Sequence, residues 1–199
     1  MCGFCGFSNL NNDISKDIHI LKNMNLSLKK RGPDEEGYFA NNNICLAHRR
    51  LVIIDKENGK QPMSAKYNDV IYTIVYNGQI YNKDEIKKEL QDLGYEFNGY
   101  SDTEVLLKGY IHFGEKILNK LNGIFSFAIW NDKKKELFLA RDQFGIKPLF
   151  YTVINETIIF SSEIKGIINY PRIEAVLDKQ GIQELFGLRT CTYSRNNTF

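Results

Sequence analysis

The stretch GIFSFAIWNDKKKELFLARD, residues 123–142, decides the fold class. Two apolar runs, GIFSFAIW and ELFLARD, are separated by a polar turn that begins Asn131-Asp132-Lys133. Consecutive strands joined by so short a turn favour antiparallel pairing. Because FSFAIW and FLA are almost continuously apolar, both faces of these strands are expected to be covered.

The same pattern extends outward from this hairpin. LFYTVI (149–154) and TIIFSS (157–162) form a second hairpin, with its turn at Asn155-Glu156. Upstream, ICLAHRRLVIID (44–55) and DVIYTIVYNG (69–78) are rich in β-branched and aromatic residues and predict further strands. Apolar stripes at helical spacing predict helices within 15–29 and after residues 82 and 101. The sequence therefore predicts an α+β sandwich of two packed antiparallel sheets with helices outside them.

Composition narrows the class of protein. The 199 residues are read as a single domain, 1–199, and a net charge of +2 argues against nucleic acid as a partner. Neither a secretory signal nor an apolar run of about 20 residues is present, so we expect no membrane association and a cytoplasmic location with reduced thiols. Cys2 and Cys5 have CxxC spacing, but no second pair follows to complete a metal site, so no metal is predicted.

The chain opens MCGFCGF, with a cysteine directly after the initiator methionine. One interpretation is a buried structural thiol. The other is a nucleophile that becomes the N-terminal residue once Met1 is removed. Its own α-amine, with a pKa of about 7.7 to 8.0, would then accept the thiol proton without a histidine. The glycine beside Cys2 is expected to leave room for an incoming amide, and Cys5, which has no adjacent α-amine, is expected to be buried.

Asn77-Gly78 in YNGQIYN also has two interpretations. Asn-Gly is a common hairpin turn, but here it leads into a predicted helix rather than a returning strand. The alternative is an oxyanion hole, in which the Asn77 amide and the Gly78 N–H donate to a tetrahedral intermediate. Arg50 and Asp102 extend this reading, since a guanidinium matches a substrate carboxylate and an aspartate neutralises an α-ammonium. An amino acid carries both groups.

The motifs MCGFCGF, RGPDEEG, AHRRLVIID, GKQPM, YNGQIYN, SDTEVLL, GIFSFAIW, ARDQFGIKPLFY and FSSEIK occur in this order. The chain, from Cys2 to about Lys165 and more weakly beyond, thereby resembles the glutaminase domain of glutamine-dependent asparagine synthetases. These are class II glutamine amidotransferases of the N-terminal-nucleophile (Ntn) hydrolase type. The resemblance implies a four-layer αββα sandwich in which Cys2 attacks the side-chain amide of glutamine and Asn77 and Gly78 hold the oxyanion. It also implies that Arg50 binds the substrate carboxylate, Asp102 binds the ammonium, and backbone groups of Leu51, Ile53 and Ile54 line the pocket.

Two positions depart from the family pattern. Cys5 stands where an aliphatic residue is expected. A glutamate usually follows Asn-Gly and contacts the substrate amine, whereas this chain has Gln79. An amide oxygen still accepts a hydrogen bond from an ammonium but lacks the charge. Somewhat weaker glutamine binding is therefore expected, with the chemistry retained.

The resemblance also defines the expected partners. These are glutamine and a C-terminal synthetase domain, before which the chain is expected to be truncated, with a homodimer left open. No cofactor is expected in this domain, because ATP and Mg²⁺ would serve the synthetase domain alone. Two alternatives stay open: the glutaminase domain of another class II amidotransferase, or a catalytically silent domain that binds an amino acid or partner chain if Met1 is retained.

Overall fold

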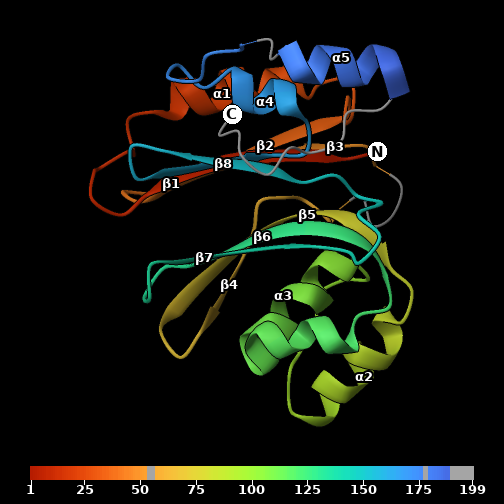
Figure 1. Cartoon of the computed structure of the whole chain (residues 1–199). Helices are drawn as coiled ribbons and strands as arrows, with labels where there is room; N and C mark the ends of the chain where they lie inside the picture. Colours follow the sequence, from red (N-terminus) through yellow and green to blue (C-terminus); the bar gives the residue numbers. More distant parts are fainter. Residues whose placement is uncertain (53–56, 177–178, 189–199) are drawn as a thin grey trace.

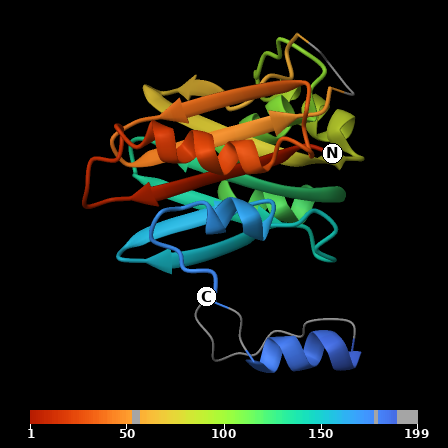
Figure 2. The same ribbon diagram turned by 90° about the horizontal axis from the view of Figure 1, so that it is seen from above.

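The computed structural model describes residues 1–52, 57–176 and 179–188 and arranges them in four layers, in the order α-β-β-α (Figure 1). Helices α1 (Ile18–Ser27) and α4 (Ile164–Ile168) cover one sheet. Helices α2 (Lys83–Asp92) and α3 (Asp102–Phe113) cover the other, and α3 is followed by a 3-10 helix, η1 (Gly114–Lys120). Figure 2 shows the last helix, α5 (Lys179–Leu188), to one side of the sandwich.

Both sheets are antiparallel throughout. The first has five strands in the order β2-β3-β1-β9-β8, with bounds Glu35–Ala40, Ile44–Arg50, Gly3–Asn9, Thr157–Ser161 and Phe150–Ile154. The second has four in the order β4-β5-β6-β7, with bounds Met63–Tyr67, Val70–Ile80, Gly123–Asn131 and Glu136–Arg141. The predicted α+β sandwich of two antiparallel sheets is therefore confirmed, and so are both predicted hairpins.

Three apolar clusters hold the four layers together. One joins the five-stranded sheet to its helices and includes Cys5, Phe7, Leu21 and Met24. The second joins the four-stranded sheet to α2 and α3 and includes Ile74, Tyr76, Leu90 and Leu106. The third lies between the two sheets and includes Phe4, Leu46, Val75 and Trp130. Since successive strand residues face opposite sides, each central strand supplies two clusters, which explains its nearly continuous apolar sequence.

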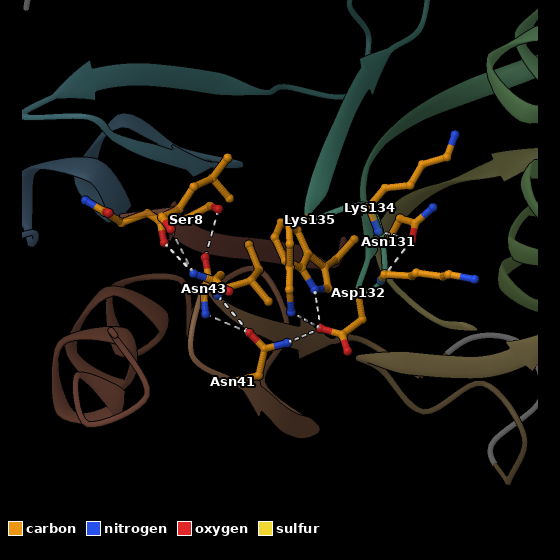
Figure 3. A network of polar contacts seen from close by, with 12 residues as sticks. Ser8, Asn41, Asn43, Asn131, Asp132, Lys134 and Lys135 are labelled. Carbon is orange, nitrogen blue, oxygen red and sulfur yellow. Dashed lines mark hydrogen bonds and ion pairs between the residues drawn. The ribbon is translucent and has the colours of Figure 1, made fainter. Parts of the chain in front are cut away.

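Polar side chains tie the two sheets together at one end of the sandwich (Figure 3). The Asn41 amide, in the β2–β3 turn, donates to Asp132 Oδ1 in the β6–β7 turn at 2.8 Å. The Asn41 side-chain oxygen also accepts the backbone N–H groups of Asn43 and Ile44. Lys135 Nζ lies 3.1 Å from the same Asp132 oxygen. We call the Asn41–Asp132 contact the clasp.

One element departs from the sequence prediction, and a second decides between two interpretations of it. The run 44–55 was expected to be one strand, but β3 ends at Arg50. Asn77 and Gly78 lie within β5, which continues to Ile80 and pairs with β6 throughout, so they form no hairpin turn. That outcome agrees with the preference for an alternative to the turn.

Candidate active site

Strand alternation brings three of the predicted site residues to one end of the gap between the sheets. The cluster that fills this gap contains Phe4 of β1, Leu46 of β3 and Val75 of β5. Cys2, Arg50 and Asn77 lie two or four residues further along the same strands or their extensions, so they face the same gap. The pairing of Gly3 with Arg49 puts Cys2 and Arg50 at the same end of the first sheet. The clasp lies at the opposite end, where Ser8 pairs with Ile44.

Cys2 is half-buried and its thiol points at the segment that follows β3. Sγ lies 3.7 Å from the carbonyl oxygen of Leu51. The Cys2 carbonyl oxygen accepts a 2.8 Å hydrogen bond from Nε of Arg31. Nη1 of the same arginine pairs with Glu163 Oε1 at 3.2 Å. A Cβ on Gly3 would lie 3.0 Å from Cδ of Arg31. The expectation that this glycine leaves room for an incoming amide is therefore corrected, because Arg31 fills the space.

Asn77 and Gly78 present two hydrogen-bond donors near this position. The Asn77 side chain is only 3% exposed, and its Nδ2 has no hydrogen-bond partner among the described residues. Gly78 pairs with Phe125, whose N–H and C=O both bond to Asp142 on the β7 side. In an antiparallel pair, this pattern points the Gly78 N–H away from β6. The N–H faces the side of β5 on which β4 lies, but β4 pairs with β5 only as far as Ile74. A buried amide without a partner costs free energy, so Nδ2 is a donor that a ligand could satisfy.

Arg50 and Arg49 face opposite sides of β3. Arg49 points outward, where it pairs with Glu36 and donates to the backbone of α1. Arg50 points into the gap, is 5% exposed, and pairs through Nη1 with Glu35 Oε2 at 2.7 Å. Both Arg50 and Glu35 line an open cavity of about 440 Å³ that also contacts His48, Lys60 and Gln61. The alternation thus directs Arg50, and not Arg49, to the side of β3 that borders this cavity.

Asp102 begins α3, where the Ser101 side chain caps the helix by accepting the Thr103 N–H. Its Oδ2 accepts a 2.7 Å hydrogen bond from the Tyr76 hydroxyl and a 3.2 Å bond from the Ile80 N–H. Burial raises the pKa of the Asp102 carboxyl, and the Tyr76 and Ile80 bonds offset part of that rise. Asp102 is thus tied to β5 one residue before and three residues after Asn77.

The remaining predicted pocket residues are placed unequally. Leu51 is half-buried and supplies the carbonyl oxygen next to the Cys2 thiol. Gln79 is exposed, at the β5 position opposite Ile124. Ile53 and Ile54 lie outside the described residues.

Sequence reasoning missed several residues that support the site. These are Glu35, paired with Arg50; Arg31, bonded to the Cys2 carbonyl; and Gln61 and Tyr76, which link β5 to α3. Gln61 was visible only as part of the motif GKQPM, without a role. His48 is buried, and burial lowers its pKa to about 3, so it is neutral at physiological pH.

The other described thiols are more deeply buried than that of Cys2. Cys5 is fully buried, as expected, and burial raises its pKa strongly. Burial also raises the pKa of Cys45 to about 12. Cys191 lies outside the described residues. Since the thiolate is the reactive form, Cys5 and Cys45 are suppressed as nucleophiles.

Within the described ranges, no cluster of three or more His, Cys, Asp or Glu residues could hold a metal ion. A search of the same ranges found no helix with the length and apolar character of a membrane span.

The sequence of this chain is similar to those of known proteins. A family model described as "Glutamine amidotransferase domain" matches residues 1–199. "Asparagine synthetase [glutamine-hydrolyzing] 3" of Bacillus subtilis is 42% identical over 188 residues, which are 94% of this chain and 31% of that protein. "Asparagine synthetase [glutamine-hydrolyzing] 1" of the same organism is 45% identical over 186 residues, covering 92% of this chain and 29% of that protein. The chain thus spans less than a third of the length of these relatives.

Solved structures share the fold at lower identity. Glutamine phosphoribosylpyrophosphate amidotransferase from B. subtilis, complexed with ADP and GMP, superposes with a TM-score of 0.70 at 21% identity. The match covers 85% of this chain and 43% of that chain.

Proposed function

This chain belongs to the glutamine amidotransferase domain family, and from that premise we propose that it hydrolyses glutamine to glutamate and ammonia, with Cys2 as an N-terminal nucleophile. Removal of Met1, whose side chain is 60% exposed, would leave the thiol and a free α-amine on the same residue. The observation that carries the proposal is the buried, unpartnered Nδ2 of Asn77 at the end of the sheet gap that Cys2 faces.

The reaction proceeds in two halves. The α-amine of Cys2 takes the thiol proton, and the sulfur attacks the side-chain carbonyl carbon of glutamine. Asn77 Nδ2 and the Gly78 N–H donate to the resulting oxyanion, a contribution worth about 100- to 1,000-fold in rate per donor. Collapse of this intermediate breaks the C–N bond, and the amine proton leaves with ammonia. Water then attacks the γ-glutamyl thioester, which releases glutamate and restores the thiol.

Two charged groups hold the ends of the substrate. Arg50 binds the α-carboxylate, because a guanidinium offers two parallel N–H donors to a carboxylate. Asp102 binds the α-ammonium, with Gln79 and the backbone of Leu51, Ile53 and Ile54 completing the pocket. The Tyr76 and Ile80 bonds to Oδ2 fix the Asp102 carboxylate in place for this contact.

The ammonia is proposed to serve a further domain. The relatives named asparagine synthetase are more than three times as long as the matched region, and in such a protein the ATP- and Mg²⁺-dependent step would belong to the remaining length. We assign the reaction to the cytoplasm, where a catalytic thiol stays reduced.

The experiment combines intact mass with a glutamate-release assay. We expect loss of the Met1 mass, hydrolysis of glutamine, and no activity in Cys2→Ala, while Cys5→Ala serves as the matched control and remains active. A glutamate inserted between Met1 and Cys2 keeps the methionine, removes the α-amine from Cys2 and should abolish activity. A fully processed chain that releases no glutamate overturns the function. Activity in Cys2→Ala overturns the nucleophile, and activity in the insertion variant overturns the α-amine as base.

A further inference from the structure

The side chain of Gln61 bridges two elements of the candidate site. Its Oε1 accepts the backbone N–H of Tyr76 at 2.6 Å, and its Nε2 donates to Thr103 Oγ1 at 3.2 Å. Tyr76 directly precedes Asn77 in β5, and Thr103 directly follows Asp102 in α3. One amide therefore bonds to the residue beside the proposed oxyanion donor, Asn77, and to the residue beside the proposed ammonium acceptor, Asp102.

Gln61 holds this place because β4 begins only at Met63. The register of β4 and β5 pairs Met63 with Ile74, so the residue next in line to face Tyr76 through its backbone is Gln61. Its carbonyl oxygen instead lies against Gly37 of β2, where a Cβ would come within 2.0 Å of it. The Gln61 side chain thus replaces a ladder bond that the backbone no longer makes.

The carbonyl group that joins Tyr76 to Asn77 has a partner as well. His48 Nε2 lies 3.0 Å from the Tyr76 carbonyl oxygen. A carbonyl only accepts, so the neutral imidazole carries its proton on Nε2 and donates it here. Together with the Tyr76 hydroxyl bond to Asp102, every polar group of Tyr76 that faces away from β6 has a partner.

We propose that Gln61 is a positioning residue for glutamine hydrolysis, which sets Asn77 through Tyr76 and sets Asp102 through Thr103. This inference rests on the proposed function. Catalytic donors must be held within about 0.5 Å of their productive place, and a displacement of about 1 Å costs about 100-fold. The two contacts of Gln61 predict two separate kinetic effects, because one leads to the oxyanion and the other to the ammonium.

The test separates these effects with matched substitutions. Gln61→Met removes both bonds at similar volume and is expected to lower kcat about 10- to 100-fold. Thr103→Val removes only the Nε2 contact and is expected to raise the KM for glutamine about two- to tenfold, with kcat changed less. Thr103→Ser restores the hydroxyl and should return KM toward that of the wild type. Gln91→Met, the same exchange on the exposed face of α2, is the control.

Alkylation of Cys2 by iodoacetamide, followed by peptide mass, provides a readout independent of turnover. A positioning role leaves this rate unchanged in Gln61→Met, since the thiol itself is untouched. Wild-type kcat and KM in a folded Gln61→Met variant overturn the inference, and so does an equal loss of kcat, substrate affinity and alkylation, which indicates general unfolding. If processed wild type fails to release glutamate, the proposed function falls first, and this inference with it.

Discussion

Nη1 of Arg50 lies 2.7 Å from Oε2 of Glu35, its cross-strand partner on β2. The side chain proposed to bind the substrate carboxylate is therefore already paired with a carboxylate of the protein. The Arg50 side chain is 6% exposed and that of Glu35 28% exposed. Glutamine therefore meets a guanidinium whose charge is partly neutralised. The pairing holds the fork in place but weakens the field that attracts the substrate.

Glu35→Gln is expected to lower the KM for glutamine about two- to fivefold. The amide keeps an acceptor for Arg50 but removes the competing charge, and a partly exposed pair of this kind is worth up to about 1 kcal/mol. Steady-state kinetics at low and high ionic strength check this, because the effect should shrink with salt. Glu36→Gln, next to the outward-facing Arg49, is the control. A raised KM would show that Glu35 orients Arg50 more than it competes with the substrate.

Asn77→Ala is expected to lower kcat about 100- to 1,000-fold, because it removes one oxyanion donor. Its thermal unfolding should move less than that of Asn9→Ala. The Asn9 side chain is equally buried but bonds to Thr157 and to the N–H groups of Asn11 and Asn12, whereas Asn77 Nδ2 has no partner to lose. The two variants should therefore show opposite profiles, with activity lost in one and stability in the other. Equal destabilisation would argue against a donor reserved for a ligand.

Asp102→Asn is expected to raise the KM for glutamine and, at pH 7, to stabilise the fold. Burial raises the pKa of Asp102 in the folded protein, so the charged carboxylate opposes folding at neutral pH. The stability difference should shrink as pH falls through the raised pKa toward about 3.9, the unfolded value, below which both states are protonated. Urea unfolding across pH measures this. A difference that grows on acidification would contradict the assignment.

Asp142→Asn is expected to lower the free energy of unfolding by about 2 kcal/mol. The carboxylate accepts the N–H groups of Phe125, Phe144, Ile146 and Lys147. Although burial acts to raise the pKa of Asp142, these bonds outweigh it and hold the pKa below the usual value. The stabilisation is therefore present above the unfolded pKa and lost as pH falls through the folded one. Chemical denaturation at several pH values checks this, with the exposed Asp92→Asn as control; a pH-independent difference would refute it.

The central strands and the edge strands β7 and β8 could be predicted from the sequence, whereas the other two edge strands could not. β6 and β9 are covered on both faces, and their apolar runs predicted them. β2 (EEGYFA) and β4 (MSAKY) are edge strands with half-exposed, polar sequences, and neither was expected. β2 and β4 bury too few apolar side chains to show a clear period in the sequence.

The candidate site divides in the same way. The sequence alone was enough to propose Cys2, Asn77 and Arg50, because residues of their chemical types are unusual at these positions. Glu35 and Gln61 could not be proposed in this way, since their importance depends on partners set by strand register and by the start of β4 at Met63. Gln61 reaches Thr103 across 42 positions of sequence, a separation that local patterns do not encode.

The clasp joins the two sheets through side chains of two turns. It ties the sheets at the end remote from Cys2. The backbone N–H groups of Asn43 and Ile44 both bond to the Asn41 side chain that forms it. These two bonds fix the orientation of the Asn41 amide, so that its other end reaches Asp132 across the gap between the sheets.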